Sequence, residues 1–192
     1  MLETLTLETE KVHFEEIFGR KAPVEVEIGC GKGKFLLARS QAEPGTDFLG
    51  IDYAGKWMKI GKQRGEKRKL PNLVFLKTEA SELVFRIPEA SVSVFHIYFP
   101  DPWPKRRHKR RRLINGAFME ILKKRLVPGG FIHIATDNED YYKQISEAAH
   151  SVKWEKLEEA VNRRLCFPEI KTNYELKYEA EGRPLYYLEA RP

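Results

Sequence analysis

Apolar residues along this chain form short runs that alternate with longer segments of helical period. Short runs of β-branched and aromatic residues bounded by turn-forming residues are typical of buried strands. They predict strands at 24–29, 47–53, 73–78, 92–99, 131–136 and 184–190. Apolar residues that recur every three or four positions predict helices at 34–43, 56–69, 114–126 and 138–150. We expect Asp137 or Asn138 to cap the last helix, and the chain beyond Val152 to be less regular.

The order of these elements predicts the fold class, because strands and helices alternate along most of the chain. Such alternation is typical of an α/β protein with a mostly parallel sheet and helices on both faces. We expect one domain over residues 1–192, in which 1–22 form a short N-terminal extension. In such sheets ligands bind beyond the carboxyl ends of the strands, so candidate motifs should follow strands.

Composition narrows the class of partner. The chain has 192 residues, a net charge of +6 and a pI of about 9.2, which favours an anionic partner such as nucleic acid. Its first residues are acidic and no apolar run is long enough for a membrane span, so we expect no secretory signal and no membrane partner. Cys30 and Cys166 lie far apart without metal-ligand spacing, which indicates a cytoplasmic compartment and no metal. The oligomeric state, monomer or homodimer, stays open.

Three glycines follow the first predicted strand in the motif EIGCGKGKF. Gly29, Gly31 and Gly33 allow a tight turn and a close approach of a ligand to the backbone. Asp52 ends the second predicted strand, about 20 residues beyond the glycines, at the spacing of a carboxylate that binds ribose hydroxyls. A glycine-rich turn without a ligand is the alternative, but the flanking strand, helix and acid favour a cofactor site.

The spacing of the glycine loop distinguishes two cofactor classes. A dinucleotide-binding loop has a small residue three positions after its second glycine, where this chain has Lys34. Glu27 precedes the loop, and its negative charge would repel a pyrophosphate but can hold the cationic amino group of S-adenosylmethionine. We therefore expect S-adenosylmethionine as the cofactor. Glu79 follows the third strand, where a carboxylate can accept from the adenine amino group; a solvated acid or a helix cap is the alternative.

The motif FPDPWPKRRHKRRR follows the fourth predicted strand. Pro100 and Pro102 restrict the backbone around Asp101 and hold it in a loop at the ligand-binding edge of the sheet. Trp103 offers a flat face on which a base can stack. Seven of the eight residues 105–112 are Lys or Arg, with no acid among them, which favours nucleic-acid contact over a merely solvated helix face.

These motifs, taken in order with ATDNEDY and TNYELKYEAEGRPLYYLE, resemble those of the bacterial tRNA (guanine-N7-)-methyltransferases from Pro23 to the end of the chain. The PDPW run and the late T-x-Y-E segment are specific to that family, whereas the glycine loop marks only the broad class of Rossmann-like methyltransferases. The resemblance implies a class I methyltransferase fold with a seven-stranded sheet and S-adenosylmethionine as methyl donor. It also implies methylation at N7 of a variable-loop guanine in tRNA.

The resemblance implies roles for individual residues as well. It assigns to the donor pocket Glu27, Asp52, Glu79 and Asp101, of which Asp101 is also the active-site residue. The residues that it implies for substrate binding are Lys105, Asp137, Thr172, Asn173, Tyr174 and Glu175, to which the basic run adds Arg106 and Arg107. Members of the family often have Glu where Asp52 stands and Asp where Glu79 stands, which keeps each carboxylate but changes its reach. Without the resemblance, TNYELK would be an ordinary polar turn.

Methylation at N7 makes particular demands on a site. Guanine N7 has an in-plane lone pair and no proton to lose, so the enzyme needs alignment and exclusion of water rather than a strong base. Asp101 or Asp137 can accept from guanine N1–H and the 2-amino group, which selects guanine and stabilises the charge that grows on the base. Methylation of an exocyclic amino group of RNA and RNA binding without catalysis stay open as alternatives, and a nicotinamide oxidoreductase comes last.

Overall fold

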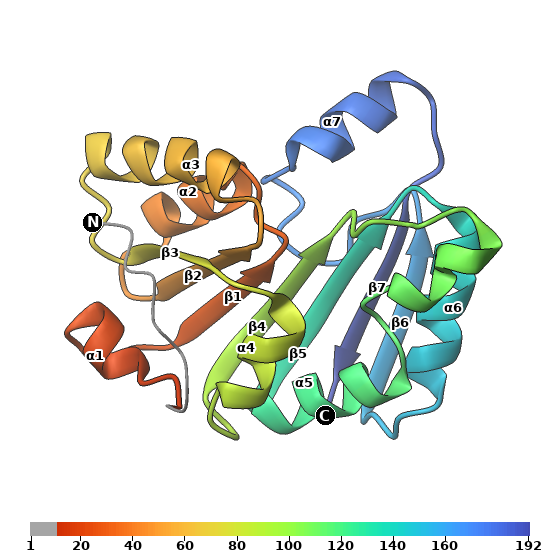
Figure 1. Ribbon diagram of the computed structural model, residues 1–192, viewed down its shortest axis with the longest axis horizontal. Helices are drawn as coiled ribbons and strands as arrows, with labels where there is room; N and C mark the ends of the chain where they lie inside the picture. Colours follow the sequence, from red (N-terminus) through yellow and green to blue (C-terminus); the bar gives the residue numbers. More distant parts are fainter. Residues whose placement is uncertain (1–10) are drawn as a thin grey trace.

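Residues 11–192, which the computed structural model describes, fold around a seven-stranded sheet (Figure 1). The strands are β1 (Val24–Ile28), β2 (Asp47–Asp52), β3 (Leu73–Lys77), β4 (Val92–Tyr98), β5 (Leu126–Thr136), β6 (Lys156–Val161) and β7 (Tyr186–Arg191). They lie in the order β3-β2-β1-β4-β5-β7-β6, and β7 runs antiparallel to both of its neighbours. The order of the chain reverses between β1 and β4, which is where parallel sheets of this type bind ligands.

Helices cover both faces of the sheet. One face packs against α4 (Ala80–Arg86), α5 (Gly116–Arg125) and α6 (Glu139–His150), whose buried side chains share an apolar cluster with β1, β4 and β5. The other face packs against α2 (Lys34–Ala42) and α3 (Gly55–Lys67), which contribute Phe35, Leu36 and Met58 to a second cluster. Because both faces are covered, the ends of the strands are the part of the sheet that a ligand can reach.

The predicted strands and helices agree with the structure to within a few residues, except at the fifth strand. β5 begins at Leu126 instead of 131, so Pro128, Gly129 and Gly130 lie inside a strand that they would usually interrupt. The register between β4 and β5 shifts at this point, which accommodates these residues as a bulge. Of the two predicted caps of α6, Asn138 is the one that caps it: its side chain accepts from the N–H of Tyr141 at 2.8 Å.

The less regular region beyond Val152 contains two elements that we did not expect. The interpretation of TNYELK as a polar turn is wrong, because this segment begins α7 (Asn173–Ala180). The side chain of Thr172 accepts from the backbone of Glu175, and the side chain of Glu175 accepts from the backbone of Thr172, so the two residues form a capping box. β6 escaped prediction because its sequence KLEEAV is mostly polar and lies at the edge of the sheet.

The predicted N-terminal extension, 1–22, lies partly outside the described residues, which begin at 11. Its described part packs on the rest of the chain. The N–H of Val12 donates to the carbonyl of Arg86 at 3.0 Å, and α1 (Phe14–Phe18) places Phe14 and Phe18 against the core. We infer that 11–22 belong to the same domain as the sheet. Within 11–192, no helix combines the length and apolar character needed to cross a membrane.

Candidate active site

Five candidate groups each end or follow a different parallel strand, so they meet at one edge of the sheet. In the order of β1 to β5 they are the glycine loop, Asp52, Glu79, Asp101 and Asp137. In Figure 1 this edge lies toward the top of the view, and α7 lies above the ends of β4 and β5. The structure thus brings candidate donor and substrate residues from separate parts of the sequence to the same edge.

The glycine loop has a backbone that glycine adopts more readily than other residues. Gly29, Gly31 and Gly33 have φ angles of 80°, 53° and 64°, all in the left-handed region. A Cβ atom at Gly33 would lie 2.4 Å from the ring of Phe75, so this position also needs the space that glycine leaves. Left-handed backbone angles and the contact with Phe75 therefore both require glycine in this loop.

The two carboxylates predicted at the ribose and at the adenine are held differently. Asp52 accepts from the N–H groups of Gly31 and Ala54, each at 2.8 Å. It fixes the loop, and lone pairs of its two oxygens remain for a hydroxyl group. Glu79 is exposed at the N-cap position of α4 and makes no side-chain capping hydrogen bond. Glu79 is therefore the N-cap residue of α4 through its backbone alone, with its carboxylate in solvent, and its contact with adenine stays a prediction.

Glu27 lies inside the protein on β1, with 4% of its surface exposed. Its Oε2 atom has no hydrogen-bond partner among the described residues. Burial raises the pKa of this carboxyl to about 8, and the Arg164 guanidinium partly opposes that rise. A buried carboxyl with an unused oxygen is an acceptor for a cationic or hydrogen-bond-donating group of a ligand.

The loop that carries Asp101 is held on both sides of it. Phe99 and Trp103 have φ angles of 51° and 42°, which bulky residues adopt rarely and which their surroundings must enforce. The guanidinium of Arg112 donates to the carbonyl of Pro102 at 2.7 Å. Between these constraints Asp101 is exposed beyond the end of β4. A constrained loop therefore presents its carboxylate to solvent at the strand end.

Trp103 has less free surface for stacking than its sequence context indicates. The guanidinium of Arg111 lies over the ring, 4.9 Å from its centroid, and His108 approaches it edge-on at 5.8 Å between centroids. These contacts within the protein reduce the surface of the indole on which a base could stack.

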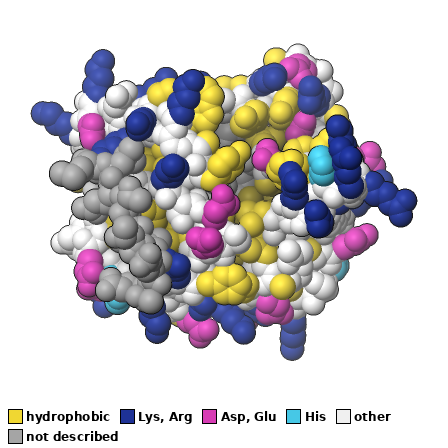
Figure 2. All heavy atoms as spheres, viewed as in Figure 1, with side chains coloured by type: hydrophobic (Ala, Val, Ile, Leu, Met, Phe, Trp, Pro, Cys, Tyr) yellow, Lys and Arg dark blue, Asp and Glu magenta, His cyan; other side chains and the backbone are white. Residues whose placement is uncertain are grey.

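The basic run divides into outward and inward parts. Most of it forms the short 3-10 helix η1 (Arg106–Arg111), and residues 105–107 are exposed without an ion pair in the described part of the chain. Arg112 is instead 4% exposed and pairs with Asp140 at 2.5 Å, and Lys109 pairs with the same carboxylate at 2.6 Å. Figure 2 shows Lys and Arg side chains gathered at the right-hand end of this face of the molecule. The exposed part of the run is available to phosphates, whereas Arg112 anchors the loop.

The predicted substrate segment at the start of α7 contains both buried and exposed residues. Thr172 is buried, and the carboxylate of Glu175, 0% exposed, forms an ion pair with Arg164. Asn173 and Tyr174 are exposed. The structure gives Thr172 and Glu175 partners inside the protein and leaves the two residues between them facing solvent. Contact with a substrate stays a prediction for all four.

Asp137, at the end of β5, is linked to α7 through an ion pair. Its carboxylate forms an ion pair of 3.0 Å with Arg183, which follows α7 along the chain. The Arg183 guanidinium in turn lies 4.6 Å from the ring centroid of Tyr178 on α7. The end of β5 and α7 are therefore connected through one arginine, and Asp137 is half-buried with one oxygen engaged.

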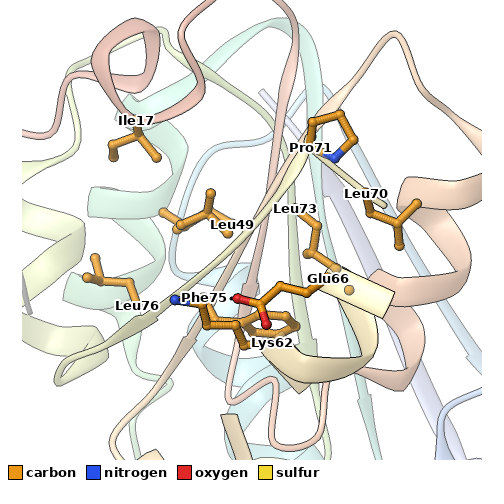
Figure 3. A pocket seen from close by; sticks show the side chains of 11 residues that line it. Ile17, Leu49, Lys62, Glu66, Leu70, Pro71, Leu73, Phe75 and Leu76 are labelled. Atoms are coloured by element: carbon orange, nitrogen blue, oxygen red, sulfur yellow. Dashed lines mark ion pairs between the residues drawn. The ribbon is translucent and has the colours of Figure 1, made fainter. Parts of the chain in front are cut away.

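Two pockets lie away from this edge. One, of about 260 Å³, opens beside the edge strand β3 and is lined by apolar residues of β3 and α1, with Lys62 and Glu66 of α3 forming an ion pair in its wall (Figure 3). The second lies around residues 12–24, 88–93 and 127. None of the candidate donor or substrate residues lines either pocket, so we give them no part in the chemistry.

Comparison with known proteins agrees with this geometry. A family model described as "Putative methyltransferase" matches residues 21–188. A tRNA (guanine-N(7)-)-methyltransferase of Chromohalobacter salexigens is 38% identical over 92% of this chain and 68% of its own length. One of Geobacter metallireducens is 35% identical over 91% of this chain and 84% of its own length. The chain belongs to the tRNA (guanine-N7-)-methyltransferase family.

Solved structures show the same fold in more distant methyltransferases. An antibiotic-related methyltransferase superposes with a TM-score of 0.62 at 20% identity and covers 99% of this chain and 97% of its own. A precorrin-6y C5,15-methyltransferase of Geobacter metallireducens gives a TM-score of 0.63 at 13% identity, over 91% of this chain and 83% of its own. The expected class I, Rossmann-like α/β fold is confirmed.

The family uses S-adenosylmethionine, and the donor side of the site fits it. Glu27 offers the unused buried oxygen that a cationic amino group would complete. Asp52 holds the glycine loop through the N–H of Gly31 and keeps lone pairs that could accept from a ribose hydroxyl. Among the described residues, no group of three or more His, Cys, Asp or Glu side chains is placed to hold a metal ion.

Sequence reasoning missed one charged residue of this region, Arg164. It lies in the irregular segment before α7 and contacts Tyr98 and Glu175, which are 66 and 11 positions away in the chain. No motif marks an arginine whose partners are assembled by the fold. The spacing of Thr172 and Glu175 was a usable signal for the start of α7, since Thr-x-x-Glu is the pattern of a capping box.

Proposed function

We propose that this protein transfers the methyl group of S-adenosylmethionine to N7 of a guanine in the variable loop of tRNA. The observation that carries the proposal is that candidate donor-binding residues and candidate RNA-binding residues lie at the same edge of the sheet. The first set has a glycine loop with the enclosed carboxyl of Glu27, and the second has Asp101 beside the exposed basic residues 105–107. The named relatives, which match more than nine-tenths of the chain, support tRNA as the RNA.

The donor, when bound, supplies a methyl carbon attached to a positively charged sulfur, and the carbon–sulfur bond breaks as the bond to N7 forms. The protein has to align these atoms and exclude water, because N7 already presents a lone pair and has no proton to lose. In this scheme Glu27 holds the amino group of the donor and Asp52 holds its ribose. Positive charge appears on the base, and the carboxylate of Asp101 stabilises it.

Selection of guanine requires acceptors for N1–H and the 2-amino group. Asp101 and Asp137 are the carboxylates at this edge that can serve, and adenine would leave such an acceptor unpaired. Asp101 is exposed, whereas the carboxylate of Asp137 is half-buried and already binds Arg183. The exposed residues 105–107 bind phosphates on either side of the target, and the guanine leaves its stack to reach the donor.

A cytoplasmic site of action is part of the proposal. Both cysteines of the chain, Cys30 and Cys166, are free thiols, which agrees with a reducing compartment where tRNA is found.

The proposal is tested by methyl transfer from S-adenosylmethionine labelled in its methyl group to unmodified total tRNA, followed by nucleoside identification by mass spectrometry. We expect the label in 7-methylguanosine. Label in a nucleoside methylated on an exocyclic amino group would assign the protein to that reaction instead. Binding of tRNA with neither donor binding nor methyl transfer would favour a module that binds RNA and does not catalyse.

A further inference from the structure

Arg164 is a charged residue enclosed at the edge of the sheet that carries the site. Its side chain is 4% exposed. The guanidinium donates to the hydroxyl of Tyr98 at 2.8 Å and to the carbonyl of Cys166 at 2.8 Å, and it forms an ion pair with Glu175. Each nitrogen of the guanidinium therefore has a partner: the last residue of β4, a carbonyl of its own loop, or a carboxylate of α7.

Glu175 has as many partners as Arg164. One of its oxygens accepts from Arg164 and from the hydroxyl of Tyr187 at 3.1 Å, and the other accepts from the N–H of Thr172 at 2.7 Å. The first turn of α7 is thus bound to the sheet through a single carboxylate. A buried ion pair is an expensive way to attach a helix, because apolar packing of similar volume avoids the desolvation of two charges. The pair is a geometric constraint on where α7 lies.

Three aromatic residues, on α7 and in the loop after β4, show what this constraint positions. Tyr174 and Tyr178 stack on each other at 5.7 Å between centroids, and the ring of Phe99 lies 5.8 Å from Tyr174 and 5.5 Å from Tyr178. Phe99 is separated from Asp101 by Pro100 alone. The three rings form an aromatic group between α7 and the end of β4, in which Phe99 and Tyr178 pack partly against the core and Tyr174 has 53% of its surface exposed. An exposed ring in contact with Phe99, two positions before Asp101, can serve as a platform for an unstacked base.

Arg164 also acts on the donor side. Burial raises the pKa of Glu27, and among neighbouring charges the Arg164 guanidinium is the one that lowers it. The same arginine therefore lies within electrostatic range of the carboxyl proposed for the donor and is bonded to the carboxylate that holds α7.

We propose that Arg164 is a positioning residue for methyl transfer: it fixes α7, and with it the aromatic group of Phe99, Tyr174 and Tyr178 on which the guanine rests, relative to the donor pocket. The inference rests on the proposed function, since it assigns the occupant of that aromatic group. Arg164 itself touches neither donor nor base.

The chain contains a matched control. Arg39 and Glu25 form a second buried ion pair, at 2.6 Å with 8% and 6% of their side chains exposed, on α2 and β1. This pair is linked to the first through His96 and Tyr98, with hydrogen bonds of 2.9 Å from His96 to each of Glu25 and Tyr98. It belongs to the same buried network and, within the described residues, makes no ion pair with α7, although the Arg39 guanidinium also lies 4.0 Å from the ring centroid of Phe167 in the segment before α7. Arg39→Met therefore controls for the loss of a buried ion pair that does not bind α7.

The experiment compares Arg164→Met and Arg39→Met for methyl transfer to an unmodified tRNA transcript, with melting temperature and S-adenosylmethionine affinity measured in parallel. Both variants should lose stability to a similar extent. We expect Arg164→Met alone to raise the KM for tRNA about tenfold or more, because the base loses its stacking surface. Its donor affinity should change less than its KM for tRNA, because the glycine loop and Asp52 are untouched. A moderate loss of donor affinity is expected, because without the Arg164 charge the buried Glu27 carboxyl ionises less readily. Arg164→Lys, which keeps the charge but not the planar fork, should recover part of the loss.

Glu175→Gln provides a second variant if Arg164→Met does not fold, since it removes the same ion pair and keeps the shape of the side chain. It should raise the KM for tRNA in the same direction. An unchanged KM in both variants, or an equal rise in Arg39→Met, would overturn the positioning role. Wild-type protein that forms no 7-methylguanosine would refute the proposed function and this inference with it, so the two failures are distinguished by the wild-type reaction.

Discussion

The donor side and the substrate side of the site hold their polar groups differently. On the donor side, Glu27 is enclosed within β1 and Asp52 is bound by two backbone N–H groups. On the substrate side, Asp101 and residues 105–107 are exposed. A rigid pocket suits a small donor of fixed shape, whereas exposed charge suits an RNA that binds and leaves. Changes on the donor side should therefore alter donor affinity and stability, and changes on the substrate side should alter the use of tRNA.

The largest effect is expected at Asp101, where the two sides meet. Asp101→Ala removes the carboxylate that stabilises charge on the methylated base, so single-turnover methyl transfer should slow about 10²- to 10³-fold. Because Asp101 is exposed, the melting temperature should change by no more than about 2 °C. A tRNA affinity that falls as much as the rate would place Asp101 in binding and not in catalysis.

The next largest effect is a loss of donor affinity in Asp52→Ala, on the donor side of the site. Asp52→Ala removes the hydrogen bonds that hold the glycine loop as well as those proposed to the ribose, so calorimetric affinity for S-adenosylmethionine should fall about 10- to 100-fold. Affinity for tRNA should remain as in wild type. Glu66→Ala, an exposed acid on α3, is the control. Normal donor affinity in Asp52→Ala would remove that residue from the donor pocket.

A smaller effect is expected on the substrate side. Exchange of Lys105, Arg106 and Arg107 for Ala should weaken tRNA binding about tenfold and lower the slope of log affinity against log salt by about two to three. The control exchanges three exposed basic residues of α3 for Ala, namely Lys59, Arg64 and Lys67. If the control reduces the salt slope as much, the basic run has no special part in binding and the contrast between the two sides fails.

The smallest effect concerns pH and Glu27. Burial places the pKa of this carboxyl at about 8 in the folded protein, above its ordinary value of 4.5. Between these values the folded state holds a proton that the unfolded state has released, so Glu27 lowers stability as pH rises from 4.5 to 8. Glu27→Gln should therefore melt a few degrees higher than wild type at pH 8, with a difference that vanishes toward pH 4.5.

The same substitution sharpens the comparison between the two sides. Glu27→Gln should gain stability and lose donor affinity together, because the buried oxygen that destabilises the free protein is the one that the donor completes. Melting curves with and without S-adenosylmethionine measure both. A variant that gains stability and binds the donor as well as wild type would show that Glu27 is not part of the pocket.

Part of each side could be predicted from the sequence. The glycine loop and Asp52 could be predicted because each follows a strand with a clear apolar pattern and the backbone itself demands glycine. The loop of Asp101 could be predicted because prolines and a dense run of charge mark it in the sequence. In both cases the decisive information is local.

The buried ion pairs around the site could not be predicted, because they depend on contacts between distant segments of the chain. That Arg112 turns inward to Asp140 while its neighbours face solvent follows from packing against α6, which a charge pattern does not contain. Arg164 and Glu175 are buried because β4, β7 and α7 converge around them. The irregular region that carries them has a mixed pattern with an exposed edge strand, so neither its strand nor its helix stood out.

The most direct test of the central claim, that this edge of the sheet brings a donor methyl group to guanine N7, uses a single unmodified tRNA transcript. The transcript is treated with the protein and S-adenosylmethionine, and then with borohydride and aniline, which cut the chain at 7-methylguanosine. We predict one scission at a variable-loop guanine with the wild-type protein and none with Asp101→Ala. A methylated transcript that resists scission would contradict the claim.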